Sequence, residues 1–104
     1  VVFQIKEYLH HNYAVPSLSV PDISEHVHLS PAYVCTLFKS ETGQTLNQYL
    51  TDYRIKMSKQ FLSDPLYKIT DISAKVGYSD GNYYSKAFRK IVGLSPSEYR
   101  EKML

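Results

Sequence analysis

The chain contains one internal repeat, and this repeat restricts the folds that it can adopt. When the sequence is displaced by 49 residues, the run 22–24 falls on the identical run 71–73, and Val27 falls on Val76. When it is displaced by 50 residues, further similar positions coincide: Ser30 and Asp80, Tyr33 and Tyr83, Phe38 and Phe88, Gly43 and Gly93, and Tyr49 and Tyr99. The second copy therefore contains one inserted residue. Two copies are too few for a solenoid, so the repeat indicates a duplicated two-helix unit.

Helix signals divide the whole chain, and no segment shows the alternation of apolar and polar residues typical of a half-buried strand. Serine, threonine or aspartate stands where five helices would begin, and glycine or proline stands near the expected ends. The sequence predicts an all-α fold of seven helices: at about 1–13, from the cap Ser19 to a turn at 28–29, from the cap Ser30 to Gly43, from the cap Thr45 to Asp64, at about 69–76, from the cap Asp80 to Gly93, and from the cap Ser95 onwards.

Each copy of the repeat has the pattern of a helix-turn-helix unit. A short helix carries a small residue that permits close helix crossing, Ser24 in the first copy and Ser73 in the second, and a tight turn follows. We expect the turns at 28–29 and 77–78; Gly77 suits a position with positive φ, and His28 suits it less. The inner faces of the second helices are then Val34, Leu37 and Phe38 in one copy, and Tyr84, Ala87, Phe88 and Ile91 in the other.

The inner faces also determine the outer faces, because residues half a turn away on a helix must point at solvent or at a partner. These outer faces carry short, hydroxyl, amide and basic groups and no carboxylate, which suits a helix that enters a major groove beside phosphates. They consist of Ala32, Cys35, Thr36 and Lys39, flanked by Tyr33 and Ser40, and of Asn82, Ser85, Lys86 and Arg89, flanked by Tyr83 and Lys90.

The fourth helix is expected to be a strut covered on two sides. One apolar stripe comprises Leu46, Tyr49, Leu50, Tyr53, Met57 and Phe61, and a nearly opposite one comprises Ile55 and Leu62. The 18 residues 46–63 would span roughly 27 Å at ~1.5 Å per residue, approaching the roughly 34 Å between successive major grooves. We therefore expect a first helix-turn-helix subdomain at 1–44, a long linker helix at 45–64 and a second subdomain at 65–104.

The whole chain resembles the AraC/XylS family of transcription regulators, and the resemblance is concentrated in the second copy. It rests there on DISAKVGYSD at 71–80, YYSKAFRK at 83–90 and GLSPSEYR at 93–100. The first half adds LSPAYV at 29–34, LFK at 37–39, Gly43, and the pairs at 49–50 and 54–55. So many spaced matches make a strong signal.

The resemblance implies a homeodomain-like, AraC-type DNA-binding domain, usually found at the carboxyl end of a bacterial regulator, with its third and sixth helices in successive major grooves. It implies base contacts by Ala32, Cys35, Thr36, Asn82, Ser85 and Lys86; the phosphate contacts expected beside them are Tyr33, Lys39, Ser40, Tyr83, Arg89 and Lys90. The implied partners are double-stranded operator DNA, RNA polymerase, and an amino-terminal sensor or receiver domain outside these residues, of which we favour a receiver. The expected location is the cytoplasm.

The sequence departs from the family pattern in two ways. Ser24, Ser58 and Ser73 stand where alanine is common in the family, and we expect them to be neutral for packing. The first outer face also lacks long hydrogen-bonding side chains. We therefore expect the first unit to read thymine methyl groups and DNA shape, and the second to supply polar readout through Asn82 and Lys86.

The net charge of +2 is weak evidence for a polyanionic partner, but its distribution is more informative. Lys6 against Glu7, Asp22 and Glu25 gives residues 1–29 a charge of −2, so residues 30–104 carry +4. The excess of positive charge lies at residues 54–59 and 86–90. A solvated helix face would explain it equally well. The main alternative function is therefore a protein-interaction module, which would show little dependence of duplex binding on salt.

Size and composition exclude several other classes. At 104 residues the chain has room for one compact domain and not for a multidomain enzyme; with 43% hydrophobic and 21% charged residues it is ordinary for a globular protein. No apolar run approaches the roughly 20 residues of a membrane span. The single Cys35 excludes an internal disulfide and suits a reducing compartment, and the start at Val1 suggests a piece of a longer chain.

No catalytic motif is present, so we expect no enzymatic activity and no cofactor. No metal is expected either, because His10, His11, His26 and His28 form no i, i+4 pair and are expected to be solvated. Tyr33 and Tyr83 are expected to be half-buried and to be secondary phosphate contacts. Arg54, at the edge of a buried stripe, is expected to form an intramolecular ion pair.

Overall fold

Seven helices and no strand form from these residues, which confirms the predicted all-α fold; the computed structural model describes residues 1–104 throughout. The helices are α1 (Val2–Asn12), α2 (Val20–Val27), α3 (Pro31–Thr42), α4 (Leu46–Leu62), α5 (Ile69–Lys75), α6 (Gly81–Val92) and α7 (Pro96–Met103). Helices α1 and α5 are one or two residues shorter than expected, a normal difference at helix ends. None of the seven combines the length and apolar character that crossing a bilayer requires.

Side chains next to the helix starts satisfy free backbone amides. Thr45 Oγ1 accepts a hydrogen bond from the Gln48 amide at 3.1 Å, and Gln48 Oε1 accepts one from the Thr45 amide at 2.9 Å. Ser95 and Glu98 form the same reciprocal pair at the start of α7. Each such cap contributes about 1 kcal/mol. The helix boundaries could be predicted because these bonds are local in sequence.

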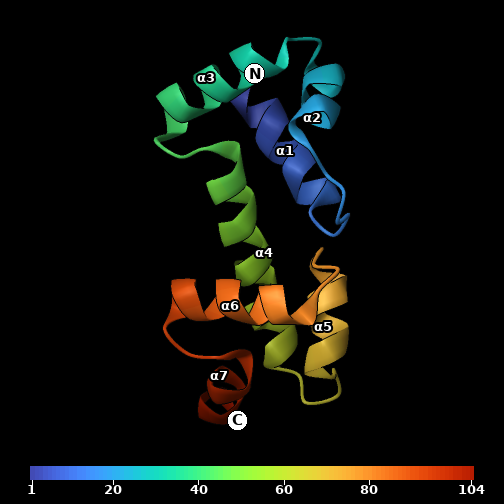
Figure 1. Cartoon of the computed structure of the whole chain (residues 1–104), viewed down its shortest axis with the longest axis vertical. Helices are drawn as coiled ribbons and strands as arrows, with labels where there is room; N and C mark the ends of the chain where they lie inside the picture. Colours follow the sequence, from blue (N-terminus) through green and yellow to red (C-terminus); the bar gives the residue numbers. More distant parts are fainter.

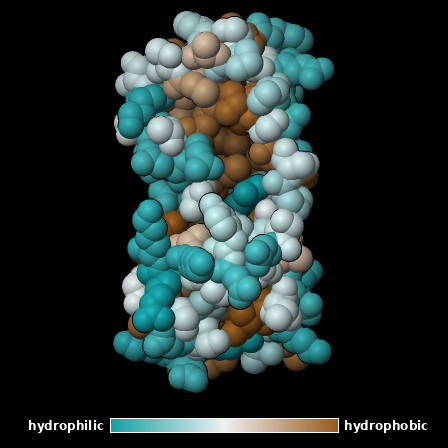
Figure 2. All heavy atoms as spheres, in the orientation of Figure 1, coloured by the Kyte–Doolittle hydropathy of each residue, from teal (hydrophilic) through white to brown (hydrophobic).

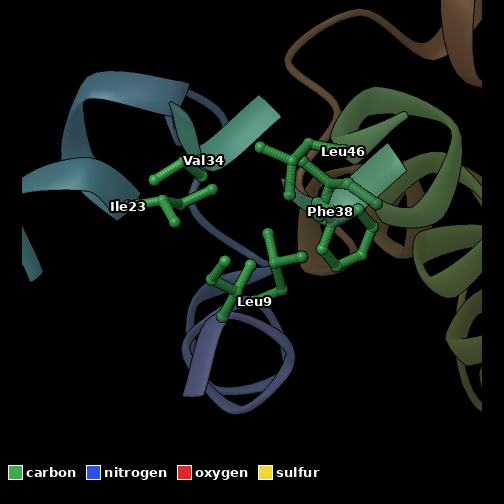
Figure 3. Close-up of a cluster of buried hydrophobic side chains, with 7 residues drawn as sticks. Leu9, Ile23, Val34, Phe38 and Leu46 are labelled. Atoms are coloured by element: carbon green, nitrogen blue, oxygen red, sulfur yellow. The ribbon is translucent and has the colours of Figure 1, made fainter. Parts of the chain in front are cut away.

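Helix α4 runs along the long axis of the molecule, which measures 43 × 22 × 21 Å (Figure 1). Helices α1–α3 surround its first half, and α5–α7 surround its second half (Figure 1). Two separate hydrophobic clusters result. The first joins α1, α2, α3 and the start of α4 through Ile5, Leu9, Ile23, Val34, Phe38, Leu46 and Leu50 (Figure 3). The second consists of Ile55, Leu62, Ile72, Val76, Tyr78, Tyr84 and Phe88.

The packing differs from expectation in two places. The stripe of α4 that begins at Leu46 is divided between the clusters, because Met57 and Phe61 pack against the second cluster and each unit covers only about half of the length of α4. Ile91 is 43% exposed, although it was expected on the inner face of α6. Helix α6 crosses in front of α4 and its last turn extends past it, which leaves Ile91 at the edge of a groove (Figure 1).

The turns that precede α3 and α6 each contain one residue with a positive φ, but the residue differs between the two turns. His28 has φ 59° and ψ 39°, and Gly77 has φ 95°. His28 is exposed at the surface. Gly77 is buried, and a Cβ there would overlap the Tyr13 carbonyl oxygen and lie 2.8 Å from Arg54 Nε. Glycine is therefore required in the second turn for space as well as for φ.

Candidate nucleic-acid interface

Helix α3 presents the first predicted face because its opposite side is anchored in the core. Ser30 Oγ accepts a hydrogen bond from the Tyr33 amide at 3.2 Å and starts the helix, with Pro31 in its first turn. Val34 and Phe38 are fully buried. The side away from them is exposed to solvent, and it carries Ala32, Cys35, Thr36, Lys39 and Ser40.

Helix α6 presents the second face by the same construction. Asp80 Oδ1 accepts a hydrogen bond from the Asn82 amide at 2.8 Å, and Tyr84 and Phe88 are fully buried. The solvent side carries Asn82, Lys86, Arg89 and Lys90, all exposed. Ser85 is only half-exposed, because it lies beside the start of α5. Of the six residues predicted to contact bases, Ser85 is thus the least accessible.

The tyrosines that flank the two faces are more exposed than expected. Tyr33 is 52% exposed and Tyr83 is 64% exposed, so the expectation that both are half-buried core residues is wrong. The ring of Tyr83 lies 5.9 Å from that of Tyr78, at the rim of the second cluster. Both hydroxyls are therefore available for contacts outside the chain, whereas a buried tyrosine would use its hydroxyl within the core.

The two faces differ in charge. Lys39 is the basic residue on the α3 face, whereas Lys86, Arg89 and Lys90 lie together on α6. No carboxylate stands between Gly81 and Gly93 to oppose them. Long-range attraction to a polyanion should therefore act mainly through the second unit.

The two helices lie across the long axis, α3 near one end of the molecule and α6 toward the other (Figure 1). In the same orientation, hydrophilic residues cover most of the lower half, while apolar side chains show in a hollow of the upper half (Figure 2). Helix α4 joins the two units, so the positions of both faces depend on one helix.

A groove of about 530 Å³ between the start of α4 and α6 was missed by the sequence reasoning. It borders the second face and is lined mainly by polar side chains, including Gln44, Asn47, Gln48, Thr51, Tyr83 and Lys90. The polar positions between the two apolar stripes of α4 are the sequence signal for this groove. Asp52 also lines the groove and accepts a hydrogen bond from Gln44 Nε2 at 2.8 Å.

Arg54 bonds within the chain, as expected, but its predicted ion pair is wrong. Its Nε donates to the Tyr13 carbonyl at 2.9 Å, and its NH2 group donates to the Val15 carbonyl at 3.0 Å. The guanidinium also lies 5.5 Å from the centre of the Tyr78 ring. Burial lowers the pKa of Arg54, and no carboxylate compensates. Both partners follow the last residue of α1: the Tyr13 carbonyl lies at the C-cap of that helix, and the Val15 carbonyl also accepts a hydrogen bond from the Leu18 amide at 3.2 Å.

The expectation of four solvated histidines is wrong for His10. Its Nε2 lies 2.8 Å from the Tyr49 hydroxyl, and its ring stacks on Tyr53 at 4.3 Å. Burial lowers the pKa of His10 below its ordinary value of 6.5, and the positive charge of Lys56 acts in the same direction. No three His, Cys, Asp or Glu side chains come together in an arrangement that could hold a metal.

Comparison with known proteins adds independent findings. A family model described as "Helix-turn-helix domain" matches residues 23–102. The Msm operon regulatory protein of Streptococcus mutans is 36% identical over 102 residues, which cover 98% of this chain and 36% of that protein. The C-terminal domain of AraT, a response regulator from Geobacillus stearothermophilus, has a TM-score of 0.93 at 29% identity, over 97% of this chain and 84% of that one.

The DNA-binding domain of AdpA, a global transcriptional factor solved in complex with a target DNA, shares the fold with a TM-score of 0.90 at 19% identity, over 97% of this chain and 90% of that one. The chain spans only part of the length of its curated relatives: 36% of one, 34% of another and 12% of a third. The family model nevertheless covers most of the chain. The chain therefore belongs to the AraC-type helix-turn-helix family, the DNA-binding domains of transcription regulators.

Proposed function

We propose that this domain binds double-stranded DNA sequence-specifically, without catalysis, by inserting α3 and α6 into successive major grooves. The observation that supports this most is the pair of exposed helix faces without carboxylates, joined by α4. The 17 residues of α4 give it a length of about 26 Å at ~1.5 Å per residue, and the long axis of 43 Å accommodates two faces roughly 34 Å apart.

We propose distinct roles for the residues of each face. Base edges would be contacted by Ala32, Cys35, Thr36, Asn82, Ser85 and Lys86, and phosphates by Tyr33, Lys39, Ser40, Tyr83, Arg89 and Lys90. The exposure of these side chains supports the assignment. Apolar or short groups on α3 suit thymine methyl groups and shape, whereas an amide and an amine on α6 suit hydrogen-bond acceptors in the major groove.

We further propose that residues 1–44 and 65–104 act as two reading subdomains and residues 45–64 as their linker. The whole protein would be a cytoplasmic transcription activator with an amino-terminal domain and a contact to RNA polymerase. A receiver domain is favoured because AraT, whose C-terminal domain this chain resembles, is a response regulator. The length of the relatives supports a further domain.

Selection of binding sites from random duplexes tests the core of the proposal. The 104-residue chain should recover sites with two specified blocks about 10 base pairs apart, centre to centre. Recovery of a single short block would contradict binding in two grooves. A protein-interaction module would recover no specific block at all.

The salt dependence of binding to a selected duplex provides a second test. The slope of log K against log salt should be about −0.9 per phosphate neutralised, and Lys90→Ala should reduce its magnitude by about one contact. Lys102→Ala is the matched control, since Lys102 is exposed on α7 and lies on neither face. Equal slopes for both variants would contradict a phosphate contact by Lys90.

The division of base readout has its own test. Lys86→Ala should relax the base preference of one block by about 1–3 kcal/mol per contact, while Thr36→Ala should change thymine preference in the other block. If Lys86→Ala left the base preference intact while changes at Thr36 and Ala32 abolished it, the proposed division would be wrong.

A further inference from the structure

The two units meet directly at one place besides α4. The loop that follows α1 comes close to the turn between α5 and α6 (Figure 1). Gly77 packs so tightly on the Tyr13 carbonyl that no Cβ would fit between them. Pro16 of the same loop lies beside Tyr78, where both line a small surface pocket. A segment of the first unit thus contacts the turn that positions α6.

Arg54 holds this meeting point together from α4. Its two hydrogen bonds, at 2.9 and 3.0 Å, go to carbonyls of the first unit, and its guanidinium lies over the Tyr78 ring of the second. Tyr13 is the C-cap of α1, where free carbonyls and the helix dipole both favour a cation. The Tyr13 side chain packs against both hydrophobic clusters. One side chain therefore connects three segments.

We propose that Arg54 is a positioning residue that determines the distance and angle between α3 and α6, and thereby the spacing of the DNA site that the domain accepts. This inference rests on the proposed binding in two grooves. Without Arg54, the units stay joined by α4, each through a different half of that helix, and by the packing of Tyr13, but no hydrogen bond then fixes the loop after α1, and a helix can bend or twist. A second point of attachment removes this freedom.

Arg100 offers a matched control because it makes the same kind of contact inside one unit. Its Nε donates to the Leu62 carbonyl at 3.0 Å, and its NH2 group donates to the Asp64 carbonyl at 3.2 Å. Those carbonyls lie at the end of α4, just as the partners of Arg54 lie at the end of α1. Loss of Arg100 should weaken the second unit without changing its position relative to the first.

The test measures Kd for the whole 104-residue chain on selected duplexes with the natural spacer, with one base pair inserted or removed, and with one block scrambled. One base pair moves a block by about 3.4 Å and turns it by about 35°. The wild type should lose about tenfold or more in affinity when the spacer changes, because a rigid pair cannot engage both blocks.

Arg54→Gln should bind the scrambled duplex like the wild type and the natural duplex several-fold more weakly. The affinity of Arg54→Gln should fall at most about threefold when the spacer changes, since two flexibly joined units can still reach a displaced block. Arg54→Lys, which can reach only one carbonyl well, should be intermediate. Arg100→Gln should keep the wild-type spacer dependence. Circular dichroism would confirm that each variant is folded.

A folded Arg54→Gln or Arg54→Lys variant with the full wild-type spacer penalty would overturn the inference. Equal weakening on scrambled and natural duplexes would also overturn it, because the residue would then act on one unit alone. If the wild type itself ignored the spacer, the proposed binding in two grooves would fail first. The two failures are thus distinguishable.

Discussion

Replacing Gly77 with alanine tests how tightly the two units are packed together. Gly77 is buried at φ 95°, and an added Cβ would overlap the Tyr13 carbonyl and lie 2.8 Å from Arg54 Nε. Left-handed backbone costs an alanine about 1–2 kcal/mol. If the methyl group also displaces the hydrogen bond between Arg54 and Tyr13, a charged donor is lost at about 1.5–3 kcal/mol. The free energy of unfolding should therefore fall by about 2.5–5 kcal/mol in total.

Gly93→Ala is the matched control. Gly93 has φ 88°, but nothing lies within 4 Å of a Cβ built there, so only the backbone cost of about 1–2 kcal/mol applies. Urea denaturation followed by far-ultraviolet circular dichroism would give both values. Equal destabilisation by the two substitutions would refute the reasoning that Gly77 is confined by the first unit. In an Arg54→Ala background, the cost of Gly77→Ala should fall by about 1.5–3 kcal/mol, because no Arg54 hydrogen bond is left to lose, but it should stay above that of Gly93→Ala because the overlap with the Tyr13 carbonyl remains.

Three further predictions follow from single residues. His28→Gly should raise the free energy of unfolding by about 0.5 kcal/mol in urea, because glycine removes the left-handed strain at φ 59°. Because the pKa of His10 is lowered in the folded state, its neutral form stabilises the fold at pH values above about 6.5, and this stabilisation is lost as the pH falls through the folded-state pKa. His10→Gln should therefore reduce the loss of stability at low pH, as measured by denaturation curves at a series of pH values. Hydrogen bonds from Ser95 lower the pKa of Glu98 below 4.5, so the ionised carboxylate stabilises the fold above pH 4.5 and this stabilisation is lost as the pH falls further. Glu98→Gln should remove this acid-dependent loss, as measured by helix content against pH.

Local signals made most of the helices predictable. Ser30 Oγ and Asp80 Oδ1 each accept a hydrogen bond from a nearby backbone amide, and these bonds span two or three residues. The exposed faces of α3 and α6 also followed from periodicity, because burying Phe38 and Phe88 leaves the opposite side to solvent. Both inferences use contacts within one or two turns of a helix.

Longer-range contacts were not predictable in the same way. Nothing in the sequence marks the carbonyls of Tyr13 and Val15 as partners of Arg54, since every residue has a carbonyl group. The division of α4 between two clusters depends on how far each unit extends along it, which placed Phe61 with the second. The exposure of Tyr83 likewise depends on how α6 crosses α4, since its side chain lines the groove between the two helices.

The two copies share the buried phenylalanine of their second helix and differ at the positions predicted to contact bases. Phe38 and Phe88 coincide in the two copies and are both fully buried. The three aligned pairs predicted to contact bases are unlike: Ala32 and Asn82, Cys35 and Ser85, and Thr36 and Lys86. A domain whose two ends recognise different bases binds its operator in one defined orientation. One copy of the chain would then define left from right along a promoter, a polarity that a symmetric dimer on a palindrome cannot provide.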